Sequence, residues 1–184
     1  MVENEFKLIL TKPQYERILA EYEWDGEVEQ TNFYYDSDAL ELSERHITCR
    51  VRRIGGEHFL QMKLPNGADY SRIEVEFPLG GELPDEIGSD MMKSLSGAEN
   101  LPDVKLIGSL KTTRMVKHFE GAEIDLDMSE YFGKTDYELE IEFTNEQKAR
   151  ELLNSITAFA GISQQGEVCR GKIRRFLDEY LKTK

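Results

Sequence analysis

Hydrophobic and polar residues alternate along most of the chain, and short turn signals separate the alternating segments. Strand side chains point to opposite faces with a period of two, so this pattern predicts strands rather than helices. The two-residue turns Gly55-Gly56 and Glu120-Gly121 are typical of β-hairpins. The pattern predicts eight strands, over Val2–Leu10, Gln30–Asp36, Ile47–Ile54, His58–Leu64, Tyr70–Leu79, Lys105–Phe119, Ala122–Met128 and Tyr137–Phe143.

Four other segments have the period and end signals of amphipathic helices. The first is capped by Thr11, and a second follows Pro84. A third begins near Asn145 and stops at Gly161, because glycine readily adopts the conformation that ends a helix. The last runs from about Glu167, and its predicted buried stripe is Ile173, Phe176, Leu177 and Tyr180.

Length and composition indicate a single domain, residues 1–184, of mixed globular composition with 39% hydrophobic and 32% charged residues. No apolar run approaches the roughly 20 residues of a spanning helix, and the N-terminus carries acids where a secretory signal carries bases. We therefore expect a cytoplasmic protein.

Cys49 and Cys169 lie far apart, which favours two reduced thiols over a zinc site or a disulfide.

The formal net charge of −13 repels phosphate backbones and anionic lipids, so we expect neither a nucleic-acid nor a membrane partner. A small anion remains compatible with this charge if bases converge locally or a metal intervenes.

Charged residues occupy one face of nearly every predicted strand. One interpretation is an ordinary antiparallel sheet whose charged face is solvated. However, the predicted helices also need an apolar sheet face to cover. If they cover it and the eight strands curl toward closure, the charged face lines the interior. Unpaired buried charge costs several kcal/mol per group, so such an interior is expected to hold divalent cations and a highly charged anion.

The charged faces contain two kinds of ligand. Carboxylates two residues apart point the same way about 7 Å apart along a strand, and hard oxygen ligands suit Mg²⁺ or Mn²⁺. Such pairs are Glu3/Glu5, Asp125/Asp127 and Glu140/Glu142. The guanidinium forks of Arg50 and Arg52 match phosphate oxygens. Acids for a metal and bases for phosphate together predict a polyphosphate substrate.

An ordered series of charged motifs spans residues 3 to 172, namely Glu3-x-Glu5-x-Lys7, Arg50-x-Arg52, Arg72-x-Glu74-x-Glu76, Arg114, Asp125-x-Asp127 and Glu138-x-Glu140-x-Glu142. This series resembles the CYTH superfamily, the triphosphate tunnel metalloenzymes. The resemblance implies a mainly β (α+β) fold, in which eight antiparallel strands close into a tunnel or barrel. The lumen would be charged, and the amphipathic helices would pack on the outer apolar faces.

The resemblance also implies roles for individual residues. The first metal ion, Mg²⁺ or Mn²⁺, would be held by Glu3, Glu5 and Glu140. Candidates for a second are Asp127 and Glu142, with Glu74 and Asp125 as further possibilities. Phosphate oxygens would be bound by Lys7, Arg50, Arg52, Lys63, Arg72 and Arg114. The catalytic candidates are Lys172, Arg52 and Arg114.

Lys172 also enters the substrate-binding set because the family commonly places a lysine on a C-terminal helix near the tunnel mouth. On the predicted helix a 100° step puts Lys172 beside the buried stripe and Arg175 nearly opposite, toward solvent. Arg170 or Arg174 could compete for this role, and a merely solvated Lys172 is the alternative. Of Tyr34 and Tyr35, which alternate, one is expected to face the tunnel and the other the core.

The sequence thus predicts metal-dependent hydrolysis of inorganic triphosphate or a related organic triphosphate. A class IV-type adenylyl cyclase making cyclic AMP from ATP is the first alternative, and a nonhydrolytic polyphosphate or nucleotide sensor is another. The expected partner is a small-molecule triphosphate, and the expected state is a monomer or homodimer.

Overall fold

The computed structural model of the chain describes residues 4–66, 72–163 and 171–184. The chain divides into two compact units, of which unit 1 contains residues 30–111 and 176–184 and unit 2 contains residues 4–29 and 112–175. Three elements run from one unit into the other, namely β2 (Gly26–Asp36), β7 (Val104–Phe119) and α5 (Lys172–Tyr180).

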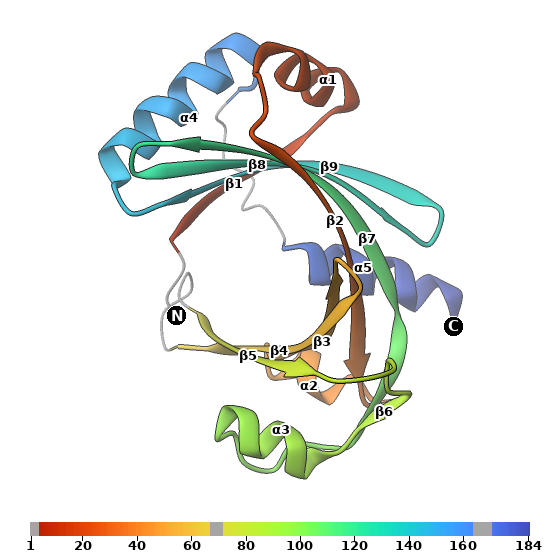
Figure 1. Cartoon of the computed structure of the whole chain (residues 1–184). Helices are drawn as coiled ribbons and strands as arrows, with labels where there is room; N and C mark the ends of the chain where they lie inside the picture. Colours follow the sequence, from red (N-terminus) through yellow and green to blue (C-terminus); the bar gives the residue numbers. More distant parts are fainter. Residues whose placement is uncertain (1–3, 67–71, 164–170) are drawn as a thin grey trace. The chain divides into compact units, whose positions relative to one another are not determined.

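Unit 2 is built on three antiparallel strands, β1 (Glu5–Leu10), β9 (Lys134–Phe143) and β8 (Ala122–Tyr131). Helices α1 (Lys12–Glu21) and α4 (Glu146–Ala160) lie on one face of these strands (Figure 1). The core between the two layers contains apolar residues from both, including Ile18, Ile156, Ile124, Leu126, Leu139 and Ile141. The alternating apolar positions therefore face the helices, as the sequence predicts.

The predicted capping residues lie at the termini of both helices. At the start of α1, the backbone N–H of Thr11 donates a hydrogen bond to Gln14 Oε1 at 2.9 Å. At the start of α4, the N–H of Lys148 donates to Asn145 Oδ1 at 3.1 Å. Gly161 ends α4 with a φ of 67°, a conformation that glycine adopts without strain.

The opposite face of the unit 2 strands brings like charges together. Asp125 lies directly across from Glu140, and Asp127 lies across from Glu138. Like charges in opposite positions destabilise a sheet unless cations compensate them. This face therefore needs bases or bound cations.

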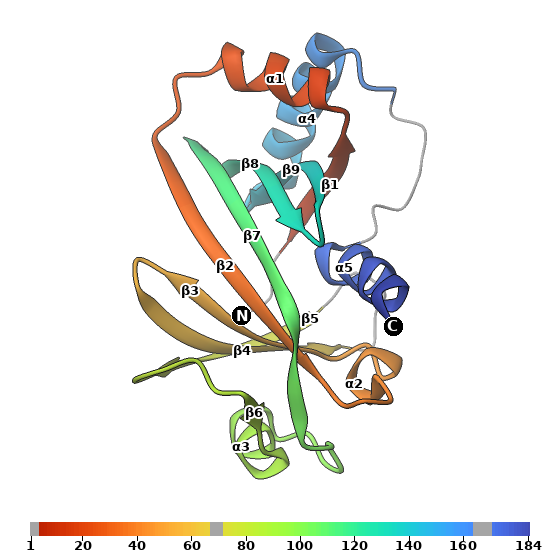
Figure 2. The ribbon, with the colours of Figure 1, turned by 90° about the vertical axis from the view of Figure 1, so that its right-hand side faces the viewer.

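Unit 1 is built on β3 (Thr48–Ile54), β4 (Glu57–Pro65) and β5 (Arg72–Leu79), which pair antiparallel in this order. Gly55 and Gly56 join β3 to β4 with φ of 58° and 88°, and two positive φ values are what a tight hairpin turn of this kind requires. Unit 1 also contains α2 (Glu41–Glu44), β6 (Glu86–Ile87) and α3 (Ser89–Ser96), seen with β3–β5 in Figure 2, and a short 3₁₀ helix, η1 (Leu181–Thr183). The elements α2, β6 and α3 pack on one face of the strands in a core that includes Leu42, Cys49, Val51, Leu60, Met62 and Met92.

All eight predicted strands are present, with ends shifted by a few residues; the predicted starts at Val2 and Tyr70 lie outside the described residues. The first three predicted helices are also present: α1 begins after Thr11, α3 follows Pro84, and α4 lies between Asn145 and Gly161. The short elements β6 and α2 were not predicted. The single turn of α2 is too short for a periodic pattern, and it is held by Asp36, whose carboxylate accepts hydrogen bonds from the N–H groups of Leu42 (2.9 Å) and Ser43 (3.0 Å). The last helix begins at Lys172; the predicted start near Glu167 lies outside the described residues.

The prediction of a mainly antiparallel β fold with packed helices is confirmed. Closure of the strands into a barrel is not confirmed, because the strand order runs β1-β9-β8-β7-β2-β3-β4-β5 and its two ends are not paired within the described residues. The described part of the chain contains no helix with the length and hydrophobicity that a membrane crossing requires.

Candidate active site

A cluster of charged side chains, hereafter the acidic cluster, occupies the face of the unit 2 strands opposite the helices. Its carboxylates are Glu5, Asp125, Asp127, Asp136, Glu138, Glu140 and Glu142, and its bases are Lys7, Arg114, Lys172 and Arg175. Asp127 is fully buried, and Asp125, Glu138 and Glu140 are at most 4% exposed. Within the described residues, the acids of this cluster outnumber its bases, and this excess of negative charge favours binding of an additional cation.

Arg114 on β7 holds three of the carboxylates. Its Nε and Nη2 donate in parallel to the two oxygens of Asp127, each at 2.8 Å, and its Nη2 also donates to Glu140 at 2.7 Å. Its Nη1 donates to Asp125. Burial alone would lower the pKa of Arg114, but the surrounding carboxylates raise it well above its ordinary value.

Lys172, the first residue of α5, also lies among carboxylates. Its Nζ is 2.5 Å from Glu140, 2.7 Å from Asp127 and 3.0 Å from Glu138. Lys172 is not merely solvated, because only 11% of its side chain is exposed. Its role toward a substrate stays a prediction.

Glu140 is paired with three bases of the cluster. Lys7 Nζ lies 2.9 Å from Glu140 Oε1, in addition to the contacts with Lys172 and Arg114. Burial would raise the pKa of Glu140, but these three bases hold it well below its ordinary value. Glu140 is therefore ionised at neutral pH.

A cation site is recognisable at one end of this cluster. Carboxylate oxygens of Glu5, Glu140 and Glu142 all lie within 4.8 Å of one another. Nearby, Asp125 Oδ1 is buried and has no hydrogen-bond partner within the described residues. Burial raises the pKa of Asp125 to about 7; Arg114 opposes this shift, and the adjacent carboxylates add to it. These oxygen ligands suit a hard divalent cation such as Mg²⁺ or Mn²⁺.

The orientation predicted for Arg175 is wrong. Its side chain is 11% exposed, with Nε donating to Asp136 at 2.8 Å and Nη2 donating to Glu138 at 2.7 Å. The helical wheel considered only the apolar stripe of α5, whereas the uncompensated carboxylates of β9 attract the guanidinium. Arg174 is exposed, and Arg170 lies outside the described residues.

A second group, hereafter the basic cluster, lies in unit 1 on the face of β2–β5 opposite the core. It consists of Arg50, Arg52, Lys63, Asn32, Gln61, Glu74 and Glu76. The strand register brings these side chains together, because Arg50 lies across from Gln61 and Lys63 lies across from Glu74. Lys63 Nζ is 2.8 Å from Glu74.

Arg50 is deeply buried in the basic cluster, with 8% of the residue exposed. Its Nε donates to Gln61 Oε1 at 2.7 Å. Its Nη2 lies 3.6 Å from Glu74, which is too long for a hydrogen bond, and it has no hydrogen-bond partner within the described residues. A buried donor without a partner is unfavourable, so this N–H is suited to an anionic ligand.

Tyr34 and Tyr35 occupy opposite faces of β2, as expected. Tyr34 pairs with Arg50 in the strand register and packs against Phe176 with ring centroids 4.8 Å apart. Tyr35 lies in the core and donates its hydroxyl to Pro84 O at 2.6 Å.

The structure divides the predicted site residues between the two units. Unit 2 brings together Glu5, Lys7, Arg114, Asp125, Asp127, Glu140, Glu142 and Lys172, whereas unit 1 brings together Arg50, Arg52, Lys63 and Glu74. Glu74, a candidate metal ligand in the sequence, lies beside the bases Arg50 and Lys63 of unit 1. Glu3 and the side chain of Arg72 lie outside the described part of the chain.

Several polar residues of the two clusters were given no role from the sequence, namely Asn32, Gln61, Glu76, Asp136, Glu138 and Arg175. Glu138 belongs to the motif Glu138-x-Glu140-x-Glu142 and lies two residues before Glu140 on the same strand face, which is a usable signal. The neutral Asn32 and Gln61 carried none without the strand register.

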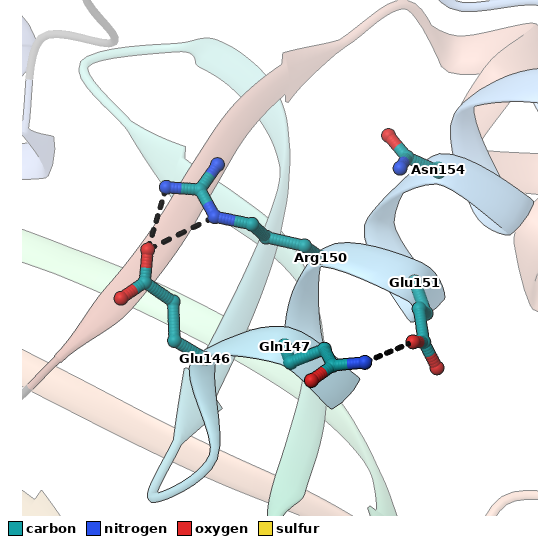
Figure 3. A pocket seen from close by; sticks show the side chains of 5 residues that line it. All are labelled: Glu146, Gln147, Arg150, Glu151 and Asn154. Carbon is teal, nitrogen blue, oxygen red and sulfur yellow. Dashed lines mark hydrogen bonds and ion pairs between the residues drawn. The ribbon is translucent and has the colours of Figure 1, made fainter.

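A hollow elsewhere, on the exposed face of α4, is lined by Glu146, Gln147, Arg150, Glu151 and Asn154 (Figure 3). Arg150 pairs with Glu146, and Gln147 donates to Glu151 at 3.1 Å, one helical turn away in each case. Exposed pairs of this kind contribute little, and the hollow contains no buried ionisable group. It is not a candidate active site.

Comparison with known proteins indicates the family of the chain. The CYTH domain family model matches residues 1–176. The chain is 30% identical over 191 residues to "Putative triphosphatase YjbK" of Bacillus subtilis, covering 99% of this chain and 97% of that protein.

Among solved structures, a Bacillus halodurans protein described as a putative adenylate cyclase is 26% identical and superposes with a TM-score of 0.76, covering 95% of this chain and 96% of that one. The Hippeastrum protein HpAC1, described as a putative adenylyl cyclase with a dominant triphosphatase activity, is 18% identical. It covers 96% of this chain and 95% of its own with a TM-score of 0.70, and at this identity it supports the fold alone. The chain belongs to the CYTH domain family.

Proposed function

We propose that this protein hydrolyses inorganic triphosphate or a related organic triphosphate with the help of a divalent cation. The observation that carries the proposal is the acid-rich cluster of unit 2, whose carboxylates can hold a cation. In unit 1, the buried Arg50 separately has an N–H donor without a hydrogen-bond partner within the described residues, which suits a phosphate oxygen. The name of the Bacillus subtilis relative, a triphosphatase, supports the same reaction.

Glu5, Glu140 and Glu142 would hold the cation, and Asp125 and Asp127 supply further carboxylates beside them. A Mg²⁺ or Mn²⁺ ion there would stabilise charge on the transferring phosphoryl group and activate the attacking water. Glu3 stays a predicted ligand, and Glu74, which pairs with Lys63, is better placed to orient a base.

Arg50, Arg52 and Lys63 would bind phosphate oxygens, and Arg72 stays in this group as a prediction. Phosphoryl transfer depends mainly on positioning and on neutralising the oxygens, so fixed cations of this kind are the contribution expected from the protein.

Lys7, Arg114 and Lys172 compensate carboxylates of the acidic cluster. A cation bound at Glu140 would replace part of this compensation. We infer that Lys172 and Arg114 then become available to phosphate oxygens, which is the catalytic role that the sequence predicts for them together with Arg52.

Product analysis tests the proposal. The purified protein is incubated with Mg²⁺ or Mn²⁺ and, separately, with inorganic triphosphate, thiamine triphosphate and ATP, and the products are separated by chromatography. Orthophosphate and pyrophosphate from inorganic triphosphate are the expected products. The matched controls are EDTA and the Glu142→Gln variant, both of which should abolish product formation.

The same experiment decides between the alternatives. The Bacillus halodurans relative favours an adenylyl cyclase, for which the products from ATP are cyclic AMP and pyrophosphate. Binding of triphosphate without any product would favour a nonhydrolytic sensor.

A single domain over residues 1–184 is proposed because one family model spans both units. The closed tunnel, the cytoplasmic location and the monomeric or homodimeric state stay predictions.

A further inference from the structure

Two bases of α5 meet at one carboxylate oxygen of β9. Arg175 Nη2 donates to Glu138 Oε2 at 2.7 Å, and Lys172 Nζ lies 3.0 Å from the same oxygen. The two bases are three residues apart on the helix, so they share a helix face. Glu138 is 1% exposed, and bases rather than water must therefore compensate its charge. The position of Lys172 is thus linked to that of Arg175 through Glu138.

Arg175 is also held from a second side, by Asp136. Its Nε donates to Asp136 Oδ2 at 2.8 Å while its Nη2 is bound to Glu138. Asp136 and Glu138 are two residues apart on β9 and share a strand face, so one planar guanidinium bridges both carboxylates. The hydroxyl of Tyr131, a residue that is 4% exposed, donates to the same oxygen of Asp136. The Asp136 carboxylate is therefore oriented from β8, and it orients the guanidinium in turn.

Lys172 needs such support, because its own side chain does not define a position. An ammonium is a point charge on a flexible stem and has no fixed fork geometry. Its Nζ lies within 3.0 Å of carboxylates from three residues, Glu140, Asp127 and Glu138. Lys172 is also the first residue of α5, so the place of its stem depends on how the first helical turn is attached. Arg175 attaches that turn to β9.

We propose that Arg175 and Asp136 are positioning residues that anchor the first turn of α5 on β9 and thereby place the Lys172 ammonium in the acidic cluster. The inference rests on the proposed function for the role of Lys172 toward phosphate. Arg175 acts through Lys172 and does not itself touch the reacting atoms.

Chemical labelling tests the position of Lys172 without a substrate. The full-length protein in EDTA is treated with acetic anhydride, and acetylation of each lysine is followed by mass spectrometry. Lys172 should react slowly, since its side chain is 11% exposed, and Lys12, which is 66% exposed, is the internal reference. In Arg175→Met, Lys172 should react about 10-fold faster relative to Lys12, the factor expected when one charge-assisted hydrogen bond no longer opposes detachment of the helical turn.

Arg175→Lys separates positioning from charge. A lysine keeps a positive charge beside Glu138, so the melting temperature should be unchanged, but a single ammonium cannot reproduce the two-sided contact with Asp136 and Glu138. Labelling of Lys172 should again be faster than in the unmodified protein. Arg150→Met, which removes an exposed ion pair on α4, is the matched control and should leave labelling and turnover unchanged.

Turnover in a double-substitution cycle tests whether Arg175 acts through Lys172. Hydrolysis of inorganic triphosphate with Mg²⁺ is measured for Arg175→Lys, for Lys172→Met and for the two combined. Small displacements of a catalytic group are costly, so Arg175→Lys alone should lower kcat/KM by about 10- to 100-fold. In the Lys172→Met background the same substitution should cause no further loss, because the group that Arg175 positions is already absent.

Unchanged labelling of Lys172 in Arg175→Met and Arg175→Lys would overturn the inference. Equal losses of kcat/KM with and without Lys172 would also overturn it, because they indicate a role of Arg175 that does not pass through Lys172. If Arg175→Met does not fold, Arg175→Lys at an unchanged melting temperature decides. If the unmodified protein does not hydrolyse triphosphate, the proposed function fails, whereas the labelling comparison in EDTA still decides whether Arg175 positions Lys172.

Discussion

Arg114 binds Asp127 through two parallel hydrogen bonds, from Nε to Oδ1 and from Nη2 to Oδ2, each 2.8 Å long. Asp127 is fully buried, so its charge has no access to water and depends on this contact and on Lys172. Removing one partner of a buried ion pair lowers the free energy of unfolding, because the other charge stays buried and uncompensated.

Arg114→Met is therefore expected to lower the free energy of unfolding by about 3–5 kcal/mol. Urea unfolding in EDTA measures this loss. Combining Arg114→Met with Asp127→Asn should recover part of it, because the stranded charge is removed as well. Arg150→Met, which removes an exposed ion pair on α4, is the control and should change stability by about 1 kcal/mol or less. Equal effects of the two single substitutions would contradict the buried pairing.

Glu5→Gln and Glu140→Gln should both abolish the stabilisation of the fold by Mg²⁺ or Mn²⁺, yet differ in EDTA. Three bases hold Glu140 ionised, so its pKa in the folded protein is lowered. Its charge therefore stabilises the fold at every pH above its ordinary pKa of 4.5. This contribution is lost as pH falls toward the lowered pKa. Glu140→Gln should therefore destabilise the protein at pH 7.5, whereas Glu5, one-third exposed, should matter little.

Thermal unfolding at several metal concentrations distinguishes the two effects. A metal-induced rise in melting temperature that survives both substitutions would remove Glu5 and Glu140 from the cation site.

Cation binding is expected to release protons from Asp125. Burial and the adjacent carboxylates raise its pKa to about 7, so this carboxyl is partly protonated at neutral pH, and a nearby cation favours the ionised form. Calorimetry of Mg²⁺ binding in two buffers of different ionisation enthalpy measures the release. Asp125→Asn should eliminate it; an enthalpy that does not depend on the buffer in the unmodified protein would count against the site.

The same raised pKa gives a stability prediction with a defined sign. The folded state retains a proton on Asp125 that the unfolded state loses near pH 4, so stability in EDTA should fall as pH rises from about 4 to 7. The curve for Asp125→Asn should fall less over this window, which urea titrations at each pH can measure.

Cys49 is expected to resist thiol reagents until the protein unfolds. It is 1% exposed, and burial raises its pKa to about 12. In a Cys169→Ser background, reaction with Ellman's reagent at pH 8 should follow the unfolding transition in urea. Rapid labelling in the absence of urea would place Cys49 outside the core of unit 1.

Strand faces were predictable from sequence because successive strand side chains point to opposite sides whatever the strand packs against. Leu126 and Asp127 are adjacent in sequence and lie on opposite faces of β8, one under the helices and one in the acidic cluster. The caps of α1 and α4 were also predictable, since Thr11 and Asn145 act within their own first turns.

Tertiary structure decided which charged groups meet. The contact of Arg175 with Asp136 depends on how α5 packs against β9, and the helical wheel predicted the opposite orientation because it contains no information on that neighbour. The contact of Gln61 with Arg50 depends on the register between β3 and β4, because a shift of one residue would turn Gln61 to the other face of the sheet. The sequence by itself thus determined which residue types share a strand face, because that follows from local backbone geometry. Only the folded chain decided their partners, because contacts between distant segments depend on packing and register.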